Sequence, residues 1–137
     1  MQKSNHQETI MTLADMLDDK IQAPEWASYV KTGHGKQRPP TQDNWWNIRA
    51  ASVLMKVQKL GPIGVSKLSV KYGTRKNRGV QPEIHTNGSR NILRKILQQL
   101  ESNKLVEQVA IKNHKGRKIT TAGLKLINEA SKKTMKN

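Results

Sequence analysis

The sequence contains no cysteine and no phenylalanine, and its acidic side chains are few: ten Asp and Glu against 25 Lys and Arg in 137 residues. The absence of cysteine excludes disulfide frameworks, Cys-ligated zinc, iron–sulfur clusters and thiol nucleophiles. No apolar run approaches the roughly 20 residues that a membrane span needs. The first ten residues, MQKSNHQETI, lack the apolar core of a signal peptide and the glycine needed for myristoylation. We therefore expect a soluble protein of a reducing compartment.

The formal net charge of +15 is concentrated in one part of the chain. Residues 1–43 carry five basic and six acidic side chains, whereas residues 44–137 carry 20 basic and only four acidic ones. A segment with so much positive charge favours a polyanion as its partner, and nucleic acid is the first candidate. A membrane partner is disfavoured, because the apolar helix faces are needed for a core.

The hydrophobic residues, 34% of the chain, fall in periodic blocks and suffice for one domain of ordinary size. We predict a single domain over residues 1–137, with a flexible tail over 131–137. Within it, the N-terminal helices and loop of residues 1–43 pack on a body formed by residues 44–130. In the N-terminal part, Ile10, Leu13 and Leu17 form the apolar stripe of a helix over 9–20. A short helix over 24–31 precedes a loop that the Pro-Pro pair keeps from being helical.

Residues 44–60 are the most informative segment. On a helical wheel, its apolar residues, Leu60 included, cover most of the circumference, which is typical of a central helix buried on several sides. Only a narrow polar stripe remains, and it is cationic. That stripe consists of Trp45, Arg49, Ser52, Lys56 and Lys59.

The remaining elements follow in a recognisable order. A short helix over 65–73 precedes a basic loop over 73–88, and Ser89 is placed to cap a helix over 90–103. Residues 105–120 alternate and turn at NHKG, which predicts a β-hairpin with a basic tip, and a last helix starts at Thr120 or Thr121. The predicted fold is mainly α: a winged-helix-like bundle around a central buried helix, with one small β-hairpin and an extra N-terminal helix.

Nothing in the sequence supports catalysis. The four histidines have no partner at ligand spacing, and no nucleophile-elbow or triad context is present. The GHG at 33–35 and the GPIG at 61–64 match no dinucleotide or phosphate-binding fingerprint and indicate turns. We predict that the protein is not an enzyme and has no metal, cofactor or small-molecule substrate.

The cationic clusters lack the carboxylates at helical spacing that an ordinary solvated face would carry. This favours phosphate contact, although a solvated loop or a localisation-like patch remains open for the RKNR run at 75–78. Trp45 either stacks on RNA or packs in the core. The candidate RNA-binding residues are Trp45, Arg49, Lys56, Lys59, Arg75, Lys76, Arg78, Arg90, Arg94, Lys95, Lys115 and Arg117.

Several strings occur together and in order: PEWASYVKTG, DNWWNIRAASVLMK, GPIGV, YGTRKNRGVQPE, GSRNILRKILQQLE and GRKITTAG. From about residue 24 to 123 the chain resembles the archaeal and eukaryotic e-type small-subunit ribosomal protein S-nineteen family. The resemblance implies a winged-helix-like protein in the head of the small ribosomal subunit. It further implies contact with small-subunit ribosomal RNA and neighbouring head proteins, and a role in RNA maturation and subunit assembly. The expected location is the cytoplasm, with nucleolar passage during assembly if the source is eukaryotic, and the protein is not an obligate homo-oligomer.

By position, the resemblance assigns RNA contact to the central helix, the basic loop and the second basic helix. The matching residues are Trp45, Arg49, Lys56, Arg75, Lys76, Arg78, Arg94 and Lys95. Met55, Gln58 and Thr121 depart from the residues frequent in the family. The alternative function is a winged-helix DNA-binding regulator. That class concentrates charge on the third helix and wing and adds a dimerisation surface, whereas here several faces are basic and no long dimer helix is present.

Overall fold

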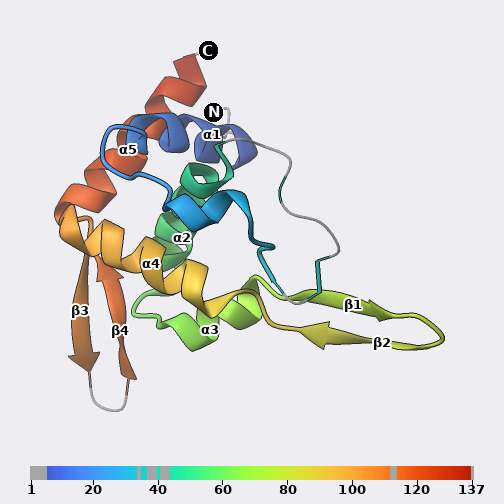
Figure 1. Ribbon diagram of the computed structural model, residues 1–137. Helices are drawn as coiled ribbons and strands as arrows, with labels where there is room; N and C mark the ends of the chain where they lie inside the picture. The colour runs from blue at the N-terminus through green and yellow to red at the C-terminus, as the bar shows by residue number, and fades with distance from the viewer. Residues whose placement is uncertain (1–5, 34, 37–39, 41–43, 112–113, 137) are drawn as a thin grey trace.

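The computed structural model describes residues 6–33, 35–36, 40, 44–111 and 114–136 (Figure 1). The described residues are mainly helical, with two small antiparallel hairpins. In chain order the elements are α1 (His6–Leu17), the 3-10 helix η1 (Glu25–Ser28), α2 (Trp45–Leu60), α3 (Val65–Lys71), β1 (Thr74–Arg78), β2 (Gln81–Thr86), α4 (Arg90–Ser102), β3 (Val106–Ile111), β4 (His114–Ile119) and α5 (Thr121–Lys136).

Helix α2 is the centre of the fold, as its apolar circumference predicts. It contacts α1, α4, α5 and β4, and its buried residues are Trp46, Ala50, Ala51, Val53, Leu54 and Val57. Burying one leucine- or valine-sized side chain contributes about 1.5–3 kcal/mol, so this helix supplies a large part of the core. Gly61, with a φ of 76°, ends the helix in a conformation that favours glycine. Leu60 differs from the prediction, because 44% of its surface is exposed beyond the last core turn.

Helix α1 packs on α2 and α5 through Leu13 and Leu17, which are fully buried, as predicted. Asp15 in α1 and Asp18 just after it are exposed. Helix α4 begins at the predicted cap, where the Ser89 hydroxyl accepts a hydrogen bond from the backbone N–H of Ile92 at 3.5 Å. One face of α4 is buried and contains Ile92, Leu93, Ile96, Leu97 and Leu100.

The prediction of a single hairpin is wrong, because the basic loop over 73–88 folds into a hairpin of its own, β1–β2. Its turn is formed by Gly79 and Val80, and Gly79 has a φ of 77°, as two-residue hairpin turns with glycine first require. Both strands are mostly exposed, so they lack the alternation of apolar residues by which a strand is recognised. The second hairpin, β3–β4, lies where it was predicted.

The C-terminal segment also differs from the expected frayed tail, because α5 continues as far as Lys136. Thr134 is only 8% exposed, and its hydroxyl lies 3.1 Å from that of Thr12 in α1 and donates to the Ala130 carbonyl. Packing against α1 therefore holds the last turns of the helix.

Candidate nucleic-acid interface

The polar stripe of α2 is joined to Tyr72, the residue that follows α3. The Arg49 guanidinium carbon lies 4.3 Å from the centre of the Tyr72 ring, and the Lys56 ammonium lies 5.1 Å from it. Ser52, between the two cations on the helix, has its hydroxyl 2.6 Å from that of Tyr72. One ring thus contacts two cations and is fixed by a hydrogen bond, an arrangement we call the Tyr72 clamp (Arg49, Ser52, Lys56 and Tyr72).

Burial changes the electrostatics of the Tyr72 clamp. Loss of hydration lowers the pKa of Arg49, and the attraction between Arg49 and Tyr72 opposes this change only in part. Burial likewise raises the pKa of Tyr72, against the opposing effects of the Ser52 hydrogen bond and Arg49. The guanidinium remains charged at neutral pH because arginine is not deprotonated in proteins. A partly dehydrated cation of this kind gains most from a bound anion.

The Tyr72 clamp contains no carboxylate. The ion pairs found among the described residues join Arg117 to Glu101 and Lys118 to Glu107, and neither includes Arg49. The predicted stripe is therefore cationic as expected, but it is not fully solvated, because Tyr72 covers its middle. Trp45 packs against the core edge-on to Trp46, with ring centres 5.5 Å apart.

The hairpin β1–β2 carries a second group of cations and begins two residues after Tyr72. Arg75 and Arg78 are exposed, and Lys76 is half-buried. The Nε of Arg78 donates to the Pro82 carbonyl at 2.8 Å, which orients this side chain along the hairpin. The helices leave the hairpin free to extend away from the core (Figure 1).

The base of β1–β2 is fixed by contacts with residues far away in the sequence. Gly33 forms a β-bridge with Gly88, and the N–H of Ser89 donates to the Thr32 carbonyl at 2.8 Å. A Cβ on Gly35 would lie 2.6 Å from the hydroxyls of Thr74 and Thr86, so glycine is needed for this close approach. The cations of β1–β2 therefore project from a fixed base.

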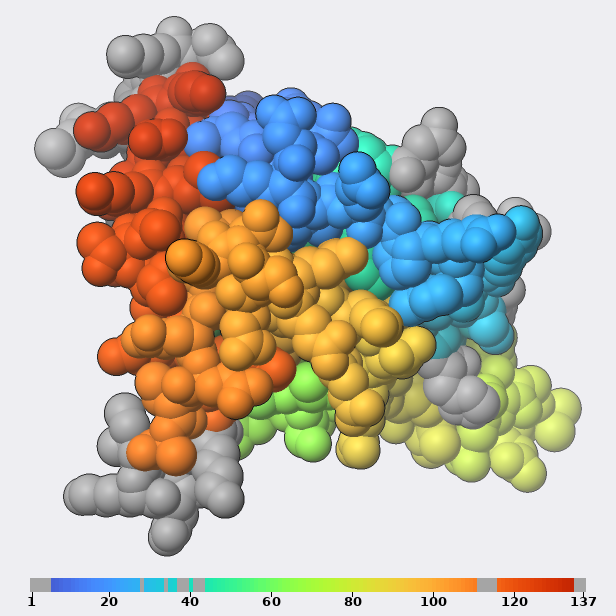
Figure 2. All heavy atoms as spheres, turned by 60° about the vertical axis from the view of Figure 1, so that its left-hand side comes forward, coloured from blue at the N-terminus to red at the C-terminus, as the bar shows by residue number. Residues whose placement is uncertain are grey.

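Helix α4 carries a third group of cations. Arg90, Arg94 and Lys95 are exposed on α4, which lies across the face seen in Figure 2, with α1 above it. Lys95 shares a shallow hollow with Asp19, which follows α1. The cations of α4 therefore form a group of their own. Lys59, the remaining candidate on α2, is exposed near the end of that helix.

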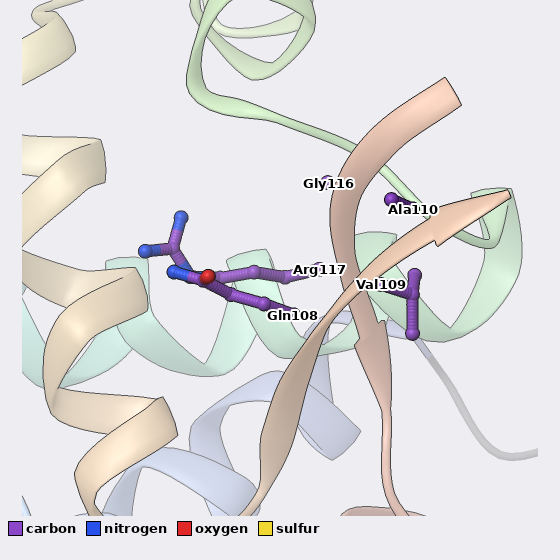
Figure 3. Close-up of a pocket in the computed structure, with 5 residues that line it drawn as sticks. All are labelled: Gln108, Val109, Ala110, Gly116 and Arg117. Atoms are coloured by element: carbon purple, nitrogen blue, oxygen red, sulfur yellow. The ribbon is translucent and has the colours of Figure 1, made fainter. Parts of the chain in front are cut away.

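The two candidate RNA-binding residues on β3–β4 are Lys115 and Arg117, and Arg117 differs from the other candidates because it is mostly buried and paired. Arg117 is only 14% exposed, and its Nε lies 3.4 Å from a carboxylate oxygen of Glu101 in α4. Figure 3 shows the Arg117 and Gln108 side chains extending on the same side of the hairpin. Arg117 therefore ties the hairpin to α4. The side chain of Lys115, the remaining candidate, lies outside the described part of the structure.

Sequence reasoning missed three residues that the fold makes prominent. Tyr72 has no sequence signal, because its partners lie 16 or more residues away along the chain. Lys67 and Lys71 stand one helical turn apart on α3, which the spacing could have indicated. Within the described ranges, no helix is long and apolar enough to span a membrane, and no group of three potential ligands gathers as a metal site.

The fold and these surfaces define a small basic protein, mainly α-helical, whose cations lie on several separate elements around one core. The sequence matches the family Ribosomal protein S19e over residues 1–137, and the chain belongs to that family.

Three archaeal relatives are named small ribosomal subunit protein eS19. The Thermoplasma volcanium protein is 40% identical over 119 residues, 87% of this chain and 77% of the relative. The Haloarcula marismortui protein is 43% identical over 124 residues, 88% and 78% of the two chains. The Aeropyrum pernix protein is 42% identical over 117 residues, 85% and 74% of the two chains.

Proposed function

We propose that the protein is a non-catalytic structural constituent of the small ribosomal subunit that binds small-subunit ribosomal RNA. The observation that carries this proposal is the Tyr72 clamp, which holds Arg49 and Lys56 on one ring without a carboxylate. Two partly dehydrated cations fixed in this way are matched to phosphate, because little side-chain entropy is lost when the anion binds. The small ribosomal subunit is proposed as the particle because the archaeal relatives are named as proteins of that subunit.

The proposed RNA surface combines the two cations of the Tyr72 clamp with Lys59 near the end of α2, the cations of β1–β2 and the exposed cations of α4. It contains Arg49, Lys56, Lys59, Arg75, Lys76, Arg78, Arg90, Arg94 and Lys95. Trp45 packs on Trp46, so we place it at the edge of the proposed RNA surface. Arg117 is not included in this surface, because it already pairs with Glu101. Cations on several faces suit a folded RNA that wraps the protein better than a single straight duplex.

The remaining parts of the proposal rest on the family resemblance. The chain is a single domain that sits in the head of the subunit beside other head proteins, and it supports RNA maturation and assembly. It acts in cytoplasmic ribosomes, with nucleolar passage if the source is eukaryotic, and it is not an obligate homo-oligomer.

We also propose that α2, α3, α4 and β3–β4 form a winged-helix-like unit. Their order supports this, and so does the isolated antiparallel bridge between Ile63 and Arg117, which joins the segment between α2 and α3 to the hairpin. In this view β1–β2 is inserted between the second and third helices, where a helix-turn-helix has a short turn. Cations spread over α2, β1–β2 and α4, rather than concentrated on one helix and a wing, count against the regulator alternative.

The experiment is sedimentation of the tagged protein on sucrose gradients in high salt. We expect the wild-type protein to sediment with the small subunit and its precursors. A double variant Arg49→Gln and Lys56→Gln should shift to the top of the gradient. The matched control is Lys132→Gln with Lys133→Gln, two exposed lysines of α5, which should sediment like wild type. Sedimentation of the wild-type protein away from small subunits, or with DNA, would contradict the proposal.

The folding of the Arg49→Gln and Lys56→Gln variant must be measured in parallel. Removing two cation–ring contacts should lower the free energy of unfolding by about 1–2 kcal/mol, which leaves a folded protein. Loss from the particles with a retained thermal transition therefore reports on RNA binding. If the variant unfolds, Tyr72→Phe, which keeps both cations and loses only the Ser52 hydrogen bond, provides the folded comparison.

A further inference from the structure

A shallow groove of about 350 Å³ lies between the end of α2 and α3, and none of its lining residues belongs to the proposed RNA surface. Its lining residues are Leu60, Pro62, Ile63, Lys67, Val70 and Lys71. Two of the apolar ones are unusually open, since Leu60 is 44% and Val70 is 52% exposed. Ile63 is held in place by its bridge to Arg117, so this side of the groove is rigid.

The chemistry of the groove favours protein over RNA. Its apolar lining is aliphatic and has no aromatic ring, so an unstacked base would find no surface on which to stack. A small ligand is also a poor match, because such sites bury most of the ligand surface, whereas half of Val70 is open here. An exposed aliphatic groove of this shape suits one or two side chains of an extended or helical protein segment.

Charge identifies the kind of segment. Lys67 and Lys71 line the groove one turn apart on either side of Val70 in sequence, and the ion pairs among the described residues include neither of them. An approaching segment that carries carboxylates beside its apolar anchor would be attracted and oriented by these two ammonium groups. The surface thus combines an apolar centre with cationic edges.

We propose that this groove, between Lys67 and Lys71, docks an acidic segment of a neighbouring small-subunit protein through one or two aliphatic anchors. The proposal rests on the function proposed above. A second copy of this chain is a weaker match. Its largest acidic group is Glu8, Asp15, Asp18 and Asp19, four of the ten acidic residues, on and just after α1, at the opposite end of the molecule from α3 (Figure 1). A contact between such different faces builds open chains of copies rather than a closed pair.

The test places photo-leucine, an aliphatic residue with a diazirine, at Val70 of the full chain, and irradiates purified small subunits that contain it. The same residue at Val80, fully exposed at the tip of β1–β2, is the reference for the RNA surface. We expect Val80 to crosslink to ribosomal RNA. We expect Val70 to crosslink to one other subunit protein, within a segment that mass spectrometry maps to aliphatic residues flanked by Asp or Glu.

Each other outcome has a distinct meaning. A Val70 crosslink to RNA, to a second copy, or to nothing in particles that contain the protein overturns the docking proposal and leaves the proposed function standing. Absence of the wild-type protein from small subunits overturns the proposed function itself, and docking within the subunit falls with it.

A charge variant tests the role of the two lysines. Lys67→Glu with Lys71→Glu should lower the Val70 crosslink yield by roughly twofold to thirtyfold, as expected for the loss of two exposed ion pairs. The Val80 crosslink should keep its yield. Lys132→Glu with Lys133→Glu on α5 makes the same charge change elsewhere and should leave both yields unchanged. Equal loss in the two double variants would show that net charge alone is responsible and would overturn the lysine assignment.

Discussion

The two hairpins have the same antiparallel topology and nearly the same length, but their environments are opposite. In β3–β4, Arg117 pairs with Glu101, and its backbone exchanges hydrogen bonds with Ile63 at 3.1 and 3.0 Å. In β1–β2, by contrast, most residues of both strands are exposed and none is buried. A two-stranded hairpin with no buried face is marginally stable alone, so β1–β2 depends on the contacts at its base.

This difference explains the composition of the two hairpins. Strands that pack against the body bury part of their surface, and in β4 the cations Arg117 and Lys118 have the carboxylate partners Glu101 and Glu107. Strands that project can carry charge without such partners, as Arg75 and Arg78 do. We infer that β3–β4 completes the fold, whereas β1–β2 presents cations to RNA.

The largest expected effect comes from Gly116→Ala, which breaks the anchored hairpin. A Cβ at this position would lie 2.7–2.9 Å from backbone atoms of Ile63, and that backbone cannot move without loss of the bridge. We expect the free energy of unfolding to fall by roughly 2–3 kcal/mol in chemical denaturation. RNA affinity, measured at a temperature where the variant is folded, should be nearly unchanged.

Gly79→Ala in β1–β2 is the matched control. Gly79 has open space around it but a φ of 77°, so alanine there meets only the intrinsic strain of about 1 kcal/mol. If Gly79→Ala destabilises the protein more than Gly116→Ala does, the assignment of the structural and the projecting hairpin is reversed.

The second prediction concerns RNA affinity and the projecting hairpin. Arg75→Gln with Arg78→Gln removes two exposed guanidinium groups, so the free energy of unfolding should change by about 0.5 kcal/mol or less. Affinity for structured small-subunit RNA should fall about tenfold to a hundredfold near 0.1 M salt. The slope of log K against log salt should become shallower by roughly two. A salt slope equal to that of the wild type would exclude these side chains from phosphate contact.

Helices with a regular spacing of apolar residues could be predicted from the sequence, because that spacing indicates which face is buried. Elements that depend on contacts between distant residues could not be predicted in this way. Helices α2 and α4 were predictable because their buried residues recur every three or four positions. The hairpin β1–β2 was not, because it is held by the distant residues Gly33 and Gly35 rather than by an apolar face.

The candidate site shows the same contrast between what local sequence patterns predict and what depends on long-range contacts. Charge alone identified Arg49 and Lys56, but their shared contact with Tyr72 depends on how α3 packs against α2. The ion pair that occupies Arg117 depends likewise on how the hairpin meets α4. A list of cations drawn from sequence therefore does not separate those that pair with a carboxylate of the fold from those that do not.

The third prediction tests this internal pairing. Arg117→Gln leaves Glu101 without its partner at a site that is partly shielded from water. The cost should lie between those of exposed and buried pairs, at about 1–2 kcal/mol of the free energy of unfolding. RNA affinity should stay within twofold of the wild-type value in a binding titration. A tenfold loss of affinity with unchanged stability would place Arg117 on the RNA instead.

The smallest expected effect belongs to the exposed pair of β3–β4, where Lys118 and Glu107 lie 3.6 Å apart and are 46% and 54% exposed. Glu107→Gln should change the free energy of unfolding by about 0.5 kcal/mol or less, because exposed pairs contribute little.

The Glu107→Gln substitution also removes a negative charge next to a lysine. If carboxylates are what keep this hairpin from acting as a phosphate surface, RNA affinity should rise slightly, by about twofold at low salt, and the gain should disappear as salt screens the charge. Titrations at 50 and 200 mM salt measure this, with Glu129→Gln on α5 as a control for net charge. An equal rise in both variants would mean that the long-range field alone acts, and that the pair on β3–β4 has no specific effect on how this hairpin meets RNA.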